Sequence, residues 1–241
     1  MNGAFRRAVL IEMGERRIEA RLEDDFHRFA LTLDHDGREV RRAEGLAERF
    51  PWSTCIDAPG ALAALEGAKV GASPAELFRH ADPRLQCTHL FELSALALAA
   101  ARDGPGRRLF EAEVSDPDGG VRIARLWRDG ALALEWRLEG ELITSPPEYA
   151  GRAPGAFTAK ALTALPIAEA EQLLILRRVV QTAQARGFDV DAFKTAAEMN
   201  RPPQCFSLQP SRAPQALRQR GSVRNWPDRA SLTASLAEPN P

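Results

Sequence analysis

The chain of 241 residues contains little lysine, few cysteines and no long apolar run. Lysines account for three of its 32 basic residues, so nearly all of the positive charge is carried by arginine. No stretch reaches the roughly 18 consecutive apolar residues that a membrane-spanning helix needs, and the first residues lack the apolar core of a signal peptide. We therefore expect a cytoplasmic protein without a membrane partner.

Cysteine and charge exclude further classes of protein. The three cysteines, Cys55, Cys87 and Cys205, are widely spaced and odd in number, which argues against a disulfide framework and favours a reducing compartment. The net charge is −1, so no overall field attracts nucleic acid, and we expect no such partner. The composition leaves a homo-oligomer open.

Familiar catalytic motifs are also absent. The chain contains no G-x-G-x-x-G, G-x-x-x-x-G-K-[ST], G-x-S-x-G or H-E-x-x-H segment. This argues against nucleotide-dependent enzymes, α/β-hydrolases and zincins, and we expect no cofactor.

Alternating apolar residues predict two groups of strands. Residues 16–46 read as antiparallel strands with a tight turn at Asp36-Gly37, and His27 shares one strand face with Phe29 and two leucines. Residues 109–144 read as a four-strand meander. Its clearest strand is 131–138, where every second residue is apolar.

Two long helices complete the predicted fold. One starts at Pro83, with Asp82 as its N-cap, and has its apolar stretch over residues 85–101; the other runs from Pro166 to Gly187. We expect a single α+β domain over residues 1–229, in which an antiparallel sheet (hairpin plus four-strand meander) packs against the two helices. Residues 230–241 are expected to form a disordered tail.

The segment Cys87–Glu92, with the sequence CTHLFE, places reactive side chains on a helix that is apolar on nearly every side. Burying an imidazole or a carboxylate without a partner costs several kcal/mol, so both groups need a reason to be there. His89 and Glu92 are three residues apart and share a helix face. Imidazole exchanges protons near neutral pH, and a carboxylate one turn away can fix its tautomer. We expect His89 to be a general acid/base, Glu92 its orienting partner and His27 a second proton donor or substrate anchor.

These residues predict a cofactor-independent lyase, isomerase or hydrolase that acts on a small apolar or carboxylate-bearing molecule in an apolar pocket. A structural interpretation stays open beside it: Cys87 would be a small core residue, Glu92 would cap the backbone and His89 would satisfy one hydrogen bond. The chain would then be a non-catalytic protein that binds a ligand or a partner.

Zinc and anion sites are further alternatives. The side chains of Cys55, Cys87, His27 and His89 offer two sulfurs and two nitrogens, a set that zinc accepts, although no C-x-x-C or H-x-x-x-H spacing is present. Arginines are frequent over 201–229. They would hold a carboxylate or phosphate, or else lie on a solvated surface, and the candidates for anion binding are Arg218, Arg220 and Arg224.

Three segments carry a resemblance to a known family. Residues 26–34, 51–55 and 86–93 resemble the bacterial domain-of-unknown-function family 2889, whose hallmark is a G-C-T-H-L-x-E-L segment. Gln86 stands here in place of the glycine, and residues 205–210 resemble a late motif of the family. The resemblance covers residues 15–225 and implies a bacterial protein, but no substrate, because the family has no established activity. It marks as positions to test His27, Cys55, Cys87, His89 and Glu92.

Overall fold

The architecture, in a computed structural model that describes residues 3–238, is one eight-stranded antiparallel sheet with helices on both faces. The strand order is β4-β3-β2-β1-β5-β6-β7-β8. The predicted α+β class with an antiparallel sheet is confirmed. The strands are β1 (Ala4–Met13), β2 (Arg17–Asp24), β3 (Arg28–His35), β4 (Val40–Arg49), β5 (Gly106–Ser115), β6 (Val121–Arg128), β7 (Ala131–Glu139) and β8 (Leu142–Ser145).

Strand β1 joins the two groups of strands, because it pairs with β2 on one side and with β5 on the other. The sequence did not predict it. Its Phe5, Val9 and Ile11 are buried under the helices, whereas Ala8 and Leu10 are buried on the opposite face. A strand covered on both faces loses the apolar–polar alternation by which strands are found.

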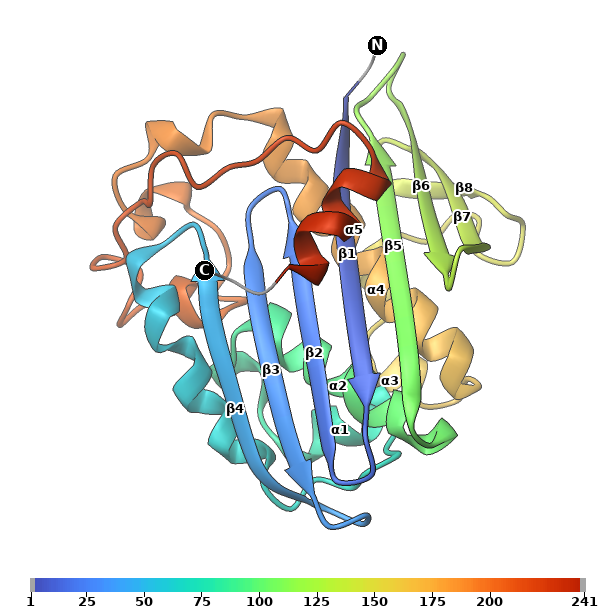
Figure 1. Cartoon of the computed structure of the whole chain (residues 1–241). Helices are drawn as coiled ribbons and strands as arrows, with labels where there is room; N and C mark the ends of the chain where they lie inside the picture. Colours follow the sequence, from blue (N-terminus) through green and yellow to red (C-terminus); the bar gives the residue numbers. More distant parts are fainter. Residues whose placement is uncertain (1–2, 239–241) are drawn as a thin grey trace.

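Most helices lie on one face of the sheet, and Figure 1 shows α2 and α4 behind it. The helices on this side are α1 (Pro74–His80), α2 (Thr88–Ala100), α3 (Ala159–Leu162) and α4 (Ile167–Ala183). A long 3₁₀ segment, Ser53–Leu65, follows β4. Among the described residues, no helix has both the length and the hydrophobicity to cross a membrane.

The other face carries α5 (Arg229–Ala237), which lies across the front of the sheet in Figure 1. Its Leu232 and Leu236 pack on Ala8 and Leu10 of β1. The prediction of a disordered tail is therefore wrong for residues 230–237, because these two leucines, four residues apart, cover the apolar spots on β1. Residues 239–241 lie outside the described part of the chain.

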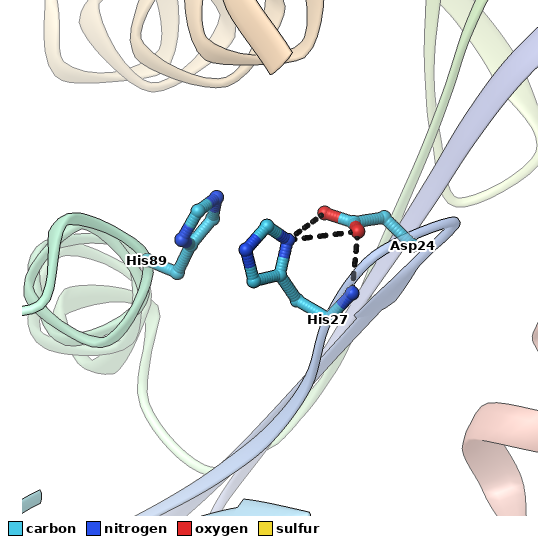
Figure 2. A group of neighbouring side chains, drawn as sticks. All are labelled: Asp24, His27 and His89. Carbon is cyan, nitrogen blue, oxygen red and sulfur yellow. Dashed lines mark hydrogen bonds and ion pairs between the residues drawn. The ribbon is translucent and has the colours of Figure 1, made fainter. Parts of the chain in front are cut away.

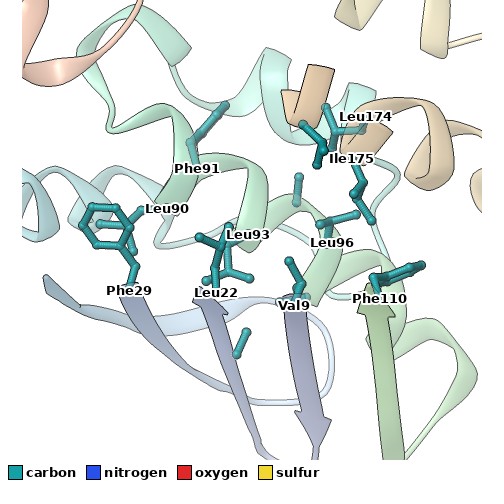
Figure 3. Close-up of a cluster of buried hydrophobic side chains, with 14 of the residues drawn as sticks. Val9, Leu22, Phe29, Leu90, Phe91, Leu93, Leu96, Phe110, Leu174 and Ile175 are labelled. Carbon is teal, nitrogen blue, oxygen red and sulfur yellow. The ribbon is translucent and has the colours of Figure 1, made fainter. Parts of the chain in front are cut away.

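The main core lies between the sheet and α2, and Figure 3 shows side chains of both layers interdigitating. Every residue of α2 from Leu90 to Ala100 is buried, which explains why its sequence is apolar in all directions. Val9, Leu22 and Phe110 approach from the strands.

The start of α2 differs from the prediction. Asp82 and Pro83 begin a single 3₁₀ turn, Pro83–Leu85, and α2 begins only at Thr88. The helix is interrupted because Gln86 is extended and its amide donates to the carbonyl of Ala61 at 2.9 Å. Cys87 is consequently the N-cap residue of α2.

Candidate functional site

A cavity of about 430 Å³ lies where the turn between β2 and β3 meets the start of α2. This volume is within the range of small-molecule sites. The lining is mainly apolar and aromatic, and both histidines singled out in the sequence, His27 and His89, belong to it. The other segments that contribute are residues 51–58 after β4, the second half of α4 with the turn that follows it, and the loop region 188–208.

The turn between β2 and β3 is organised by Asp24. Its Oδ1 accepts the backbone N–H groups of Phe26 at 2.7 Å and His27 at 2.8 Å, and its Oδ2 accepts Nε of Arg7 at 2.9 Å. Asp24 is fully buried. An aspartate that bonds the N–H groups two and three residues ahead closes a tight turn, which is why the two strands reverse here.

The same carboxylate holds the ring of His27. Nδ1 of His27 lies 3.0 Å from Oδ1 of Asp24, so the carboxylate accepts the Nδ1 proton and Nε2 keeps its lone pair. Nε2 of His27 makes no hydrogen bond with the described residues. Figure 2 shows the His27 ring between Asp24 and His89.

The two imidazoles come from different layers of the fold and lie face to face. The centroids of the His27 and His89 rings are 3.9 Å apart with the planes tilted by 32°. The ring of Phe29 is nearly parallel to both, at 5.8 Å from His27 and 6.1 Å from His89. Nε2 of His89 is buried and has no partner within residues 3–238.

Burial and charge set the protonation states of this group. Burial lowers the pKa of His27, although the Asp24 carboxylate acts in the opposite direction. Burial also lowers the pKa of His89 well below 6.5, and the neighbouring His27 and Arg7 add to the effect. For Asp24 burial would raise the pKa, but His27 and Arg7 hold it well below its usual value. At neutral pH the site therefore contains one carboxylate and two neutral imidazoles.

Glu92 does not have the partner that the sequence predicted. Its Oε2 accepts Nε of Arg178 at 2.8 Å, and its Oε1 accepts Nη2 of Arg178 at 2.7 Å and Nη2 of Arg177 at 3.0 Å. Although burial opposes ionisation, these guanidiniums lower the pKa of Glu92. The orienting carboxylate of the site is Asp24, which holds His27; Glu92 instead anchors two arginines of α4 to α2.

The cysteines line the cavity without being activated. Burial raises the pKa of Cys55 to about 12 and raises those of Cys87 and Cys205. The Sγ atom of Cys55 lies 3.1 Å from the hydroxyl oxygen of Ser207. Neutral thiols are poor nucleophiles, so the geometry favours an imidazole as the reactive group.

A metal would find a different ligand set from the predicted one. The side chains of Asp24, His27 and His89 each offer an atom within 4.8 Å of the others, and this group does not include Cys55 or Cys87. Both oxygens of Asp24 already accept hydrogen bonds from the protein. The set therefore fits a carboxylate that orients a histidine better than one that coordinates an ion.

The arginines singled out as anion-binding candidates are bound elsewhere. Arg218 pairs with Asp191 at 2.8 Å and donates to the carbonyl of Pro51. Nε of Arg220 donates to the carbonyl of Asp191, and Nη1 of Arg224 donates to the carbonyl of Gly221. None of the three is among the described residues that line the cavity. The arginines that do line it are Arg178, which the sequence did not single out, and Arg201, which belongs to the arginine-rich stretch 201–229.

Comparisons with known proteins do not place the chain in a family. No protein-family model matches the chain, and no curated protein has a matching sequence. The resemblance of the CTHLFE segment to family 2889 stays a prediction.

Proposed function

We propose that the chain is a cofactor-independent acid–base enzyme, a lyase, isomerase or hydrolase, that acts on a small, largely apolar molecule. The observation that carries the proposal is the Asp24–His27 hydrogen bond on the wall of an apolar cavity. A neutral imidazole with a free Nε2 accepts a proton from a bound molecule, and the carboxylate behind it stabilises the imidazolium that forms.

His27 takes the leading role in this proposal and His89 the second. Their rings are in contact, so a proton taken up at His27 meets a second neutral imidazole beside it. Burial lowers the pKa of both histidines, so both are neutral at pH 7 and each has one nitrogen that accepts a proton and one that donates. His89 would deliver a proton to, or polarise, a second atom of the same molecule.

The buried position of His27 supports the same function. His27 is 8% exposed, and aromatic side chains line the cavity beside it. In such surroundings electrostatic interactions are stronger than in water, and a charge that develops on the bound molecule is stabilised more effectively.

The test compares turnover by wild-type protein, by two variants of the site and by one control variant. A panel of small aromatic acids, esters and aldehydes is incubated with each protein, and products are followed by mass spectrometry. We expect Asp24→Asn and His27→Gln to lower turnover by roughly a hundredfold or more, while His80→Gln, a change at an exposed histidine outside the cavity, leaves it unchanged. Turnover by folded Asp24→Asn at the wild-type rate would contradict the proposal.

A further inference from the structure

The cavity has an uneven balance of charge. Arg178 and Arg201 line it, and no aspartate or glutamate is among the described lining residues. The other titratable groups on its wall are the imidazoles, whose pKa values burial lowers, and the cysteines, whose pKa values burial raises. These groups are neutral at pH 7, so the wall carries net positive charge and attracts an anionic molecule.

Arg178 is held in place with part of its guanidinium unused. Its Nε and Nη2 bind the two oxygens of Glu92 in a fork, which fixes the plane of the group. Nη1 makes no hydrogen bond with the described residues. Because a guanidinium has five N–H donors, the edge formed by Nη1 and Nη2 is left for a second carboxylate.

The charge of Arg178 is also not fully compensated. Arg177 shares Glu92 with it, so two guanidiniums face one carboxylate and one positive charge remains. An additional anion that binds Arg178 would complete the neutralisation of this buried cluster. Preorganised arginines of this kind are typical of carboxylate recognition.

Flat rings form the rest of the wall. The rings of His27, His89 and Phe29 are close to parallel, with interplanar angles of 32° or less. Phe26, Trp52 and Phe206 also line the cavity. Aromatic faces stack with planar rings better than with puckered ones.

At the cavity wall the guanidinium of Arg201 lies 5.7 Å from the ring centre of Phe188 and has no ion-pair partner in the described chain.

We propose that the cavity binds an aromatic carboxylate, with the carboxylate on the Nη1–Nη2 edge of Arg178 and the ring among the aromatic side chains beside His27. The identity of this molecule as a substrate rests on the proposed function, whereas its binding does not. Arg201 supplies long-range attraction from the wall and not the specific contact, since its guanidinium is exposed to solvent.

Binding of matched probes to the full chain tests this inference by calorimetry. Cinnamate and its neutral analogue cinnamamide differ in charge and not in the ring. We expect cinnamate to bind wild-type protein at least about tenfold more tightly, the value of a charge-assisted hydrogen bond. A second pair, cinnamate and 3-cyclohexylpropanoate, separates the ring from the charge, and we expect cinnamate to bind more tightly.

Variants then locate the carboxylate. In Arg178→Gln the preference for cinnamate over cinnamamide should disappear, and in Arg178→Lys, which keeps the charge but not the fork, it should be reduced. Arg224→Gln is the matched control, because Arg224 lies outside the cavity lining, and it should behave as wild type. If neither Arg178 variant folds, the ratio of the affinities of wild-type protein for cinnamate and cinnamamide tests the inference on its own.

Three results would overturn the inference: equal affinity for cinnamate and cinnamamide, no binding of either, or an unchanged preference in folded Arg178→Gln. Asp24→Asn separates this inference from the proposed function. Asp24 lies behind His27 and does not line the cavity, so the folded variant should keep the preference for cinnamate over cinnamamide. Unaltered binding together with unaltered turnover would remove the acid–base role and leave an aromatic-carboxylate binding protein.

Discussion

Asp24 and His27 are bound twice across the turn between β2 and β3: Oδ1 of Asp24 accepts both the backbone N–H of His27, at 2.8 Å, and the Nδ1 proton of its ring, at 3.0 Å. One carboxylate oxygen therefore fixes the backbone and the tautomer of the same residue. The ring cannot rotate without losing a buried hydrogen bond. This relationship gives His27 a defined orientation and leaves its Nε2 available.

The first prediction concerns the protonation of His27. The negative charge of Asp24 raises the pKa of His27 against the effect of burial. Replacing Asp24 with asparagine removes that charge, so we expect the pKa of His27 to fall below its wild-type value. Nitrogen-15 NMR titration measures it, and Asp34→Asn at an exposed ion pair is the control. An unchanged or higher pKa in Asp24→Asn would show that the charge of Asp24 does not reach the ring.

The second prediction concerns stability against pH. The pKa of His89 is well below 6.5 in the folded protein, so between that value and 6.5 the unfolded state binds more protons than the folded state. The contribution of His89 to the free energy of unfolding is therefore constant above about pH 6.5 and becomes less favourable as the pH falls below that value. Asp25, whose pKa burial raises to about 6, contributes with the opposite sign, because its stability is lost as the pH rises.

A comparison of variants separates the contributions of His89 and Asp25 to the pH dependence of stability. We expect the melting temperature of wild-type protein to fall more between pH 7 and pH 5 than that of His89→Phe, which cannot be protonated. His80→Gln serves as the control on an exposed histidine. Parallel curves for wild type and His89→Phe would mean that His89 is not held neutral.

The third prediction concerns the Glu92 cluster. Glu92→Gln leaves Arg177 and Arg178 without a buried counter-charge. Removing one partner of a buried ion pair costs about 3–5 kcal/mol of unfolding free energy, which chemical denaturation measures. The exposed pair of Arg17 and Asp34 provides the contrast, since Asp34→Asn should cost roughly 1 kcal/mol or less. Equal losses in the two variants would contradict the assigned role of Glu92.

The fourth prediction concerns zinc. Because both oxygens of Asp24 and the Nδ1 atom of His27 are already hydrogen-bonded, the two histidines alone offer free ligand atoms in the candidate group. Two nitrogens do not make a stable zinc site. We expect untagged protein to contain well below one zinc per chain by elemental mass spectrometry. One zinc per chain that His89→Ala removes would make the group a metal centre.

The sequence indicates the two histidines of the site but not the carboxylate that orients one of them. His27 and His89 stand out because each is an ionisable residue in an apolar pattern, and both line the cavity. Their contact depends on how α2 crosses β2 and β3, which no local pattern encodes. Asp24 was missed because a turn between charged strands is where an aspartate is expected anyway, although its position three residues before His27 was an available signal.

Contacts between residues far apart in the chain explain the other differences between the predicted and the observed structure. The spacing of one helical turn predicts a contact between Glu92 and His89. Glu92 instead binds two arginines of α4 that are about 85 residues away in the chain. Likewise, the position of residues 230–241 at the chain end, after a stretch rich in proline and serine, predicts a tail, whereas Leu232 and Leu236 of α5 find their apolar partners on the distant strand β1. Alternation within strands and turn signals, by contrast, predicted the antiparallel α+β class from local residues alone.

Binding and turnover measured together in wild-type protein and in folded Asp24→Asn, on the aromatic carboxylate that wild-type protein converts fastest, test the role of the Asp24–His27 pair most directly. We expect the variant to bind this molecule at least as tightly as wild type and to turn it over roughly a hundredfold more slowly or worse. Equal turnover in the two proteins would show that the Asp24–His27 pair is a structural feature of the β2–β3 turn and not the acid–base group of an enzyme.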